Sequence, residues 1–170
     1  YLSGRFGQKP DDVNAYAASS FYAVDRFASY KTDWGAFYRE GGLVLSDRYT
    51  TSNAVHQCSK LPPAQWDGFL NWLFDFEYKK IGIPEPDLVL YLAVDPEVSQ
   101  KLLENRYHGD ESKKDIQEKD REYMARSRAA AEYCARTLGW QRIECTCAGR
   151  AMRPVEEINA EILAKTDRIL

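Results

Sequence analysis

Short apolar runs alternate along the chain with longer stretches that have helical spacing. Runs rich in apolar side chains at residues 43–46, 88–94 and 140–145 predict three short strands. The middle run, LVLYLAV, is continuously apolar, which is typical of a parallel strand buried on both faces. Because helices are predicted between the strands, the pattern indicates the α/β fold class with a parallel sheet.

The predicted helices carry apolar side chains three or four positions apart. The first is predicted to start at Asp11 or Asp12, either of which can cap a helix, and to end near Tyr30. Tyr22 and Arg26 lie on a different face from its predicted core stripe, which comprises Ala17, Phe21, Val24 and Ala28. A short helix or turn is predicted over residues 33–39, and further helices are predicted over residues 51–60, 62–81, 95–107, 116–138 and 155–169.

The organisation of the chain is predicted to be a single domain. Its 170 residues suffice for a hydrophobic core, and the sequence shows no repeat and no low-complexity linker. The polar, glycine-containing stretch at about residues 107–116 is predicted to be an exposed loop. Since a helix precedes the first of only three predicted strands, the chain is expected to begin inside a domain.

Composition and charge argue against several classes of protein. The net charge is −3 and no block of Lys and Arg occurs, which argues against nucleic acid as the main partner. No apolar run approaches ~18 residues, so no membrane-spanning helix is predicted. The cysteines are not spaced for zinc and are predicted to be free thiols in a reducing, cytoplasmic compartment: Cys58, Cys134, Cys145 and Cys147.

A candidate ligand site follows the first predicted strand, because ligands in open α/β sheets bind beyond the carboxyl ends of the strands. Asp47 and Arg48 stand at that position. Arg48 could hold a phosphate through two parallel hydrogen bonds, and Asp47 could orient that arginine or a metal-bound water. Asn53, His56 and Gln57 follow on a predicted helix whose N-terminus favours anions. The alternative interpretation is a solvated surface pair beside ordinary polar helix residues.

Tyr22 and Arg26 form a second candidate pair on the first predicted helix. An aromatic face could stack on a nucleobase while the arginine bonds the edge of that base. The alternative is a packed ring beside a solvated charge.

Three stretches together resemble the thymidylate kinase family over essentially the whole chain: SSFYAVDRFASY, LSDRYTTSNAVHQ and PDLVLYLAVDPEVSQKLLENR. The resemblance implies a P-loop NTPase-like, three-layer α/β/α fold with a parallel sheet. It implies transfer of the γ-phosphoryl group of ATP to dTMP, which gives dTDP, with Mg²⁺. It also implies a homodimer in the intact enzyme, for which the aromatic-rich residues 66–78 could provide a face instead of ordinary core.

The resemblance also assigns roles around the acceptor nucleotide. Arg48 matches the arginine that holds the acceptor phosphate, Asp47 an acidic residue near the magnesium, and Arg26 the arginine at the thymine edge. Tyr22 matches the stacking aromatic and is preferred to its neighbour Phe21, which is predicted to face the core. The substrate-binding set implied in this way comprises Tyr22, Phe21, Arg26, Ser52, Asn53, His56 and Gln57, with His56 beside the sugar.

On the ATP side, Arg106 matches an arginine that packs on the adenine. The loop at about residues 107–116 resembles the lid over the phosphates, and Lys113, Lys114 and Arg121 are candidates for contacts with them. Unlike the family, the sequence contains no GxxxxGK[ST] loop, the backbone cradle for ATP phosphates. The chain is therefore predicted to be a fragment without the N-terminal strand and P-loop, to carry mainly the acceptor site, and to be inactive alone.

Two alternatives remain open at this stage. The first is a related kinase that phosphorylates a nucleoside or another nucleotide, which the groups around Tyr22, Arg26 and Asn53 would decide. The second is a non-catalytic module that binds a nucleotide or a partner protein and has lost its P-loop.

Overall fold

The computed structural model describes residues 3, 5–106, 120–148 and 151–167, without the side chain of Arg121. The chain forms two compact units, and each is described by itself. The first unit comprises residues 1–85 and 116–132, and the second comprises residues 86–115 and 133–170. The prediction of one domain stays a prediction.

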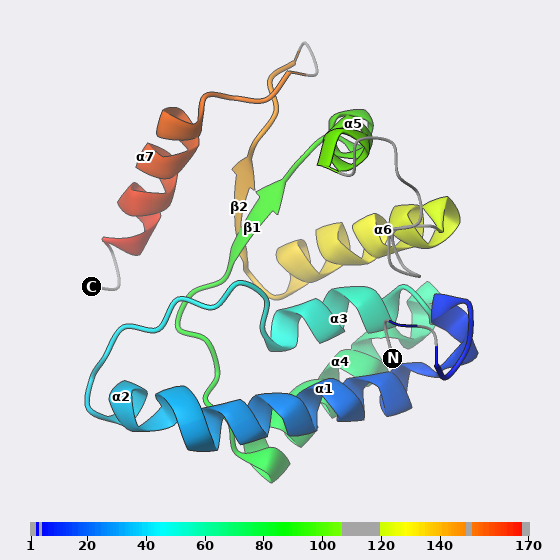
Figure 1. The fold of residues 1–170 in the computed structure, drawn as a ribbon, viewed down its shortest axis with the longest axis vertical. Coiled ribbons are helices and arrows are strands. Elements are labelled where there is room, and N and C mark those ends of the chain that lie inside the picture. The colour runs from blue at the N-terminus through cyan, green and yellow to red at the C-terminus, as the bar shows by residue number, and fades with distance from the viewer. Residues whose placement is uncertain (1–2, 4, 107–119, 149–150, 168–170) are drawn as a thin grey trace. The chain divides into compact units, whose positions relative to one another are not determined.

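The first unit is helical (Figure 1). It contains α1 (Ala15–Ser29), α2 (Gly35–Arg39), α3 (Thr50–Cys58), α4 (Trp66–Phe74) and the first part of α6 (Arg121–Thr137). Helix α1 packs against α3, and α3 packs against α4. The buried apolar side chains of these helices form the core of the unit: Ala15, Ala18, Ala23, Ala54, Cys58, Trp66, Phe69, Leu70, Leu73, Tyr123, Ala130 and Ala131.

The cap of α1 differs from the prediction. Asn14, not Asp11 or Asp12, caps the helix, because its side chain accepts a hydrogen bond of 2.9 Å from the N–H of Ala17. Asp12 lies in a preceding 3₁₀ turn, where its carboxylate instead accepts a hydrogen bond of 3.0 Å from the N–H of Lys9. The predicted end of the helix near Tyr30 is confirmed.

The buried stripe of α1 also differs from the prediction. Phe21 and Val24 were expected in the core, but they are 49% and 62% exposed. The buried positions of this helix are small: Ala15, Ala18, Ser19 and Ala23. Small side chains allow helices to approach closely, so this face packs against its neighbours and leaves the bulky residues outside. Tyr22 and Arg26 lie half-buried beside the small-residue face.

Residues 43–46 do not form the predicted buried strand. Leu43 is 66% exposed and Leu45 is 92% exposed. A strand needs a neighbour to bond its backbone N–H and C=O groups, and no described residue pairs with this segment. Asp47 and Arg48 therefore follow an extended, exposed segment rather than a strand.

Two π-helical segments prolong helices of the first unit. Tyr30–Trp34 follows α1, and Asp75–Ile81 follows α4 until Gly82, which has a φ of +82°. The N–H of Gly35 bonds the carbonyl of Tyr30, five residues earlier. A Cβ on Gly35 would lie 2.2 Å from that oxygen, so only glycine fits there. Segments of this kind often occur at functional sites.

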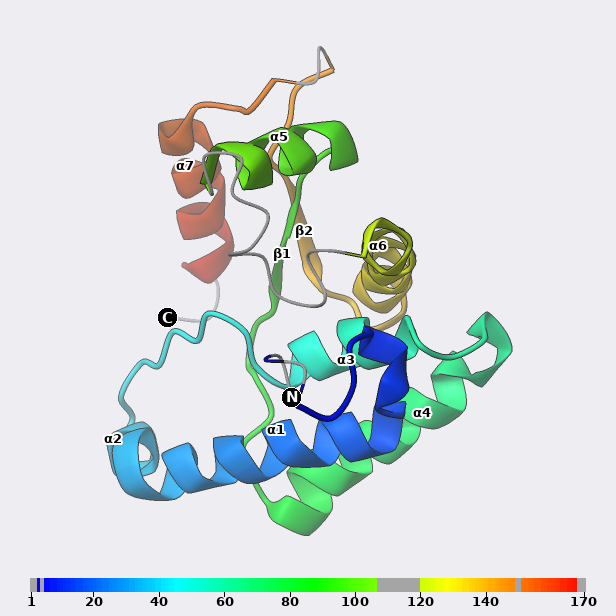
Figure 2. The ribbon, with the colours of Figure 1, turned by 45° about the vertical axis from the view of Figure 1, so that its right-hand side comes forward.

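The second unit contains the sheet (Figure 2). Strands β1 (Leu90–Ala93) and β2 (Gln141–Glu144) pair in parallel, with Leu90 opposite Gln141 and Ala93 opposite Glu144. Helices α5 (Pro96–Arg106) and α7 (Val155–Thr166) belong to this unit, and α7 packs on β2. Two predicted strands and the α/β fold class with a parallel sheet are therefore confirmed.

Strand β1 is less buried than its apolar sequence predicts, because Leu92 is 49% exposed. The sheet pairs only two strands within the described residues, which leaves part of its surface open. All four cysteines are free thiols, as predicted. Among the residues that the structure describes, no helix has the length and apolar character needed to cross a bilayer.

Candidate functional site

A buried carboxylate connects three helical segments of the first unit. Glu77 is fully buried and accepts hydrogen bonds from two nitrogens of Arg26, Nε at 2.8 Å and Nη2 at 2.7 Å. Nδ2 of Asn53 donates a third hydrogen bond of 3.0 Å to Glu77 Oε1. We call Arg26, Asn53 and Glu77 the Glu77 cluster. Its charges are paired in a bidentate geometry, which is the arrangement that makes a buried ion pair tolerable.

Three helical segments bring the Glu77 cluster together. Arg26 lies in the last turn of α1, and Asn53 lies in the first turn of α3. Glu77 lies in the π-helical segment Asp75–Ile81, whose wider turn changes which side chains face inward. These contacts span 51 and 24 residues of sequence, so the cluster exists only in the folded chain.

Two tyrosines lie close to the Glu77 cluster. The guanidinium carbon of Arg26 lies 6.0 Å from the ring centre of Tyr49, whose hydroxyl donates a hydrogen bond of 2.8 Å to the carbonyl of Pro84. The hydroxyl of Tyr78 shares a hydrogen bond of 2.5 Å with that of Thr50. Burial raises the pKa of Tyr49 and raises the pKa of Tyr78 to about 12, so both phenols stay neutral at physiological pH.

The amide of Asn53 has a defined orientation. Its Nδ2 donates to Glu77 and also, at 3.3 Å, to the carbonyl of Ser19. Both partners are acceptors, so the nitrogen must face them and the oxygen must face away. Within the described part of the chain, no group donates to Asn53 Oδ1 and none accepts from Arg26 Nη1. The acceptor Oδ1 of Asn53 and the donor Nη1 of Arg26 are therefore available to hydrogen-bond a ligand.

Gln57 lies one turn further along α3 and is 1% exposed. Neither its Nε2 nor its Oε1 has a hydrogen-bond partner among the described residues. A buried polar group without a partner costs about 1–3 kcal/mol, so such a group in a folded protein calls for an explanation. A bound molecule with hydrogen-bonding groups of its own would supply the missing partners.

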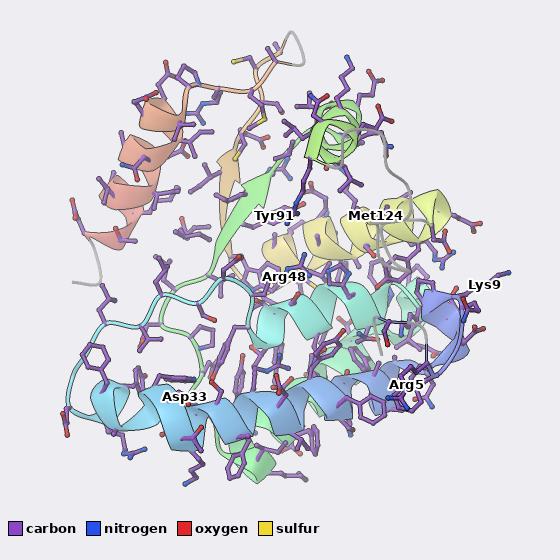
Figure 3. All side chains as sticks on the ribbon, in the orientation of Figure 1. Arg5, Lys9, Asp33, Arg48, Tyr91 and Met124 are labelled. Carbon is purple, nitrogen blue, oxygen red and sulfur yellow. The ribbon has the colours of Figure 1, made fainter. Side chains whose placement is uncertain are left out.

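Asp47 and Arg48 lie in the bend that precedes α3. Figure 3 shows Arg48 at the start of that helix. Both side chains are exposed, and no described residue forms an ion pair with Arg48. That Asp47 orients Arg48 or a metal-bound water stays a prediction. Arg48 has a φ of +71°, a conformation that is costly for a residue with a side chain, and Ser46 Oγ donates a hydrogen bond of 2.7 Å to its carbonyl. An unpaired guanidinium beside a helix N-terminus suits an anion.

Asp47 offers an oxygen ligand of the kind that Mg²⁺ prefers. The described residues contain no group of three or more His, Cys, Asp or Glu side chains that could hold one metal ion. Mg²⁺, however, commonly takes one or two carboxylates and completes its shell with phosphate and water oxygens. The exposed carboxylate of Asp47 fits the role of such a single ligand.

The other residues of the predicted acceptor site have varied environments. Tyr22 and Ser52 are half-buried on α1 and α3. Phe21 does not face the core: it is 49% exposed and stacks on Phe6, with ring centres 5.5 Å apart. His56 Nδ1 lies 3.2 Å from the hydroxyl of Tyr123 on α6, and the two rings are stacked.

Among the predicted ATP-binding residues, the structure describes the side chain of Arg106. Arg106 is exposed at the end of α5, in the second unit. Lys113, Lys114 and the predicted lid at about residues 107–116 lie outside the described residues, as does the side chain of Arg121.

Sequence reasoning missed Glu77 and its neighbours Tyr49, Thr50 and Tyr78. The available signal was weak: Glu77 is an acidic residue within the aromatic stretch 66–78, which was interpreted as core or as a dimer face. A charge at a position with helical spacing to buried aromatics is the feature that could have marked it.

Comparison with known proteins assigns the chain to a family. The family model described as thymidylate kinase matches residues 7–147. This chain belongs to the thymidylate kinase family. Its helices and parallel strands agree with the P-loop kinase-like α/β fold of that family.

Curated relatives carry the same name. Thymidylate kinase of Mycobacterium tuberculosis is 30% identical over 141 residues, which cover 82% of this chain and 64% of that protein. A probable thymidylate kinase of Staphylothermus marinus is 33% identical over 88 residues, covering 52% of this chain and 40% of that protein. Thymidylate kinase of Caenorhabditis elegans is 28% identical over 98 residues, covering 58% and 40%. The chain thus spans less than two thirds of the length of these relatives.

Proposed function

We propose that this chain carries mainly the acceptor site of a nucleoside monophosphate kinase. That enzyme transfers the γ-phosphoryl group of ATP to dTMP and gives dTDP. Membership of the thymidylate kinase family supports the reaction. The observation that carries the proposal is the Glu77 cluster, which leaves unused a donor of Arg26 and an acceptor of Asn53. Asn53 follows the unpaired Arg48 by five positions. Base-binding groups and a phosphate-binding group together suit a nucleoside monophosphate.

Each acceptor-site residue has a role in this proposal. Arg48 binds the phosphate, Arg26 bonds the edge of the thymine, and Tyr22 stacks on its face. Asn53 and Gln57 bond the base from α3, and the buried, unpaired amide of Gln57 supports its part. The half-buried Ser52 and His56 lie on the same helix, with His56 beside the sugar. Phe21 has the weakest support, because it is exposed and stacks on Phe6.

The donor side of the reaction involves ATP and Mg²⁺. Phosphoryl transfer depends mostly on positioning the two substrates and on stabilising charge. In the proposal, Asp47 provides an oxygen ligand for the metal, whose charge would neutralise the phosphates when it is bound. Arg106, Lys113, Lys114 and Arg121 are proposed to contact ATP, and a homodimer is the proposed assembly.

Removing the proposed phosphate contact should weaken dTMP binding. Arg48→Ala is expected to cost about 1.5–3 kcal/mol of binding free energy, or roughly 10- to 150-fold in Kd, since a bidentate charged contact is lost. Calorimetry at matched salt measures this change. Arg5→Ala is a matched control, because Figure 3 places Arg5 away from Arg48, and it should leave Kd unchanged. Equal Kd values for the wild type and Arg48→Ala would contradict the proposed role, and no binding of dTMP by the folded wild type would contradict the proposed function.

The 170 residues by themselves are expected to show no ATP-dependent turnover of dTMP. They contain no GxxxxGK[ST] loop, and without its backbone N–H groups and lysine the ATP phosphates have no cradle. A coupled assay for ADP, run on the same preparation that binds dTMP in the calorimeter, checks this expectation. Turnover above the level of a no-enzyme control would contradict it.

A further inference from the structure

Glu77 contacts both of the groups that the proposed function places at the thymine base. An ionised carboxylate only accepts hydrogen bonds, so every polar group that faces it must be a donor. Arg26 turns Nε and Nη2 toward Glu77, and Asn53 turns Nδ2 toward it. The carboxylate therefore dictates which edges of these two side chains remain for a ligand.

The orientation of Asn53 is the more informative of the two. An isolated asparagine can rotate its amide by half a turn and exchange its donor and acceptor ends. Here the carbonyl of Ser19 and Oε1 of Glu77 both accept from Nδ2, at 3.3 and 3.0 Å, which fixes one orientation. Asn53 is 2% exposed and Glu77 fully buried, so water does not compete effectively for these bonds.

The groups left over form a defined hydrogen-bonding pattern. Asn53 offers the acceptor Oδ1, and Arg26 offers the donor Nη1. Thymine and uracil carry a donor at N3 beside an acceptor at O4, which complements this pattern. Cytosine carries an acceptor at N3 beside an amino donor at N4, and would place acceptor against acceptor and donor against donor.

We propose that Glu77 is a positioning residue that sets base specificity, because it orients Asn53 and Arg26 so that the site takes a pyrimidine with an N3 hydrogen and an O4 carbonyl and rejects cytosine. This inference rests on the proposed function of the acceptor site. It predicts discrimination between bases, whereas a merely structural ion pair would support all ligands equally.

The test is Glu77→Gln in the 170-residue chain, with calorimetric titrations of dTMP, dUMP and dCMP at matched salt. A glutamine amide can donate to Asn53 Oδ1, so only the longer bond to the Ser19 carbonyl still favours the original orientation, and the asparagine can reverse and present Nδ2 to the base. The ratio of Kd for dCMP to Kd for dTMP is expected to fall by about tenfold or more, since hydrogen-bond mismatches against a built polar site are strongly rejected. Glu77→Asp retains an acceptor-only carboxylate and is expected to keep a ratio close to that of the wild type and well above that of Glu77→Gln.

The outcomes separate the two proposals. If the folded wild type binds no dTMP, the proposed function fails and this inference fails with it. If the wild type binds dTMP but does not prefer it to dCMP, only the inference is overturned, whatever the variants do. An unchanged ratio in folded Glu77→Gln, or an equal loss of the ratio in Glu77→Asp, also overturns the inference alone. Thermal unfolding of each variant establishes that it is folded before titration.

Discussion

Replacing Arg26 with alanine should lower the unfolding free energy of the chain by about 3–5 kcal/mol at neutral pH. The change leaves the Glu77 carboxylate without its cationic partner, and Glu77 is fully buried. The remaining hydrogen bond from Asn53 does not replace two bonds from a guanidinium. Urea denaturation, followed by far-UV circular dichroism, measures the difference from the wild type.

A control variant and a double variant show whether the loss of stability comes from the unpaired charge of Glu77. Lys80→Ala removes a cation from an exposed pair with Asp75 and should leave the denaturation midpoint within error, because exposed pairs contribute little. The double variant Arg26→Ala/Glu77→Gln removes the unpaired charge and should recover part of the lost stability. If Arg26→Ala is no less stable than Lys80→Ala, the Arg26–Glu77 pair does not organise the first unit.

The sequence predicted the strands of the second unit better than the segment before Arg48. Residues 88–94 and 140–145 contain β1 and β2, which pair in parallel as expected. Residues 43–46 have a similar apolar pattern, yet Leu45 is 92% exposed. A run of apolar residues indicates that burial of the segment would be favourable in free energy. It does not indicate whether a neighbouring strand is present to bond the backbone of that segment.

The helix α1 shows a different limit of pattern reading. Its end near Tyr30 was predicted, but its start was not, and the periodic pattern placed Phe21 and Val24 in the core although both side chains are exposed. The buried residues are instead Ala18, Ser19 and Ala23, because their small side chains let the neighbouring helices pack closely. Hydrophobic periodicity scores size and polarity of side chains, and it misses a face that is buried because it is small.

The candidate site was predictable only where local motifs resemble the family. Arg26, Asn53 and Arg48 came from such motifs, and the structure places the first two in one hydrogen-bonded cluster. Glu77 did not, since a charge in a helical stretch is usually solvated and its partners lie 51 and 24 residues away. Long-range pairing of buried polar groups is a property of the fold that no local pattern contains.

Replacing the amide nitrogen of Asn53 with an oxygen should lower the unfolding free energy about as much as Arg26→Ala does. Asn53→Asp replaces the Nδ2 donor with an oxygen, so that a second carboxylate faces Glu77 at about hydrogen-bond distance inside the first unit. Like charges in a buried site disfavour the doubly ionised state strongly. The variant is expected to lose about 3–5 kcal/mol of unfolding free energy at neutral pH, a magnitude typical of an uncompensated buried charge.

The pH dependence of that loss gives the sharper test. The folded variant can relieve the repulsion by binding one proton between the two carboxyls, whereas in the unfolded chain both ionise near ordinary values of about 4. The folded state then binds more protons than the unfolded state above that pH, so its stability relative to the wild type falls as pH rises. Urea denaturation at about pH 5 and about pH 8 should show the larger deficit at the higher pH. Asn71→Asp, the same substitution at an exposed position of α4, should show no such trend. A deficit in Asn53→Asp that does not change with pH would mean that the new side chain turns away from Glu77, and the orientation of Asn53 would then not depend on that carboxylate.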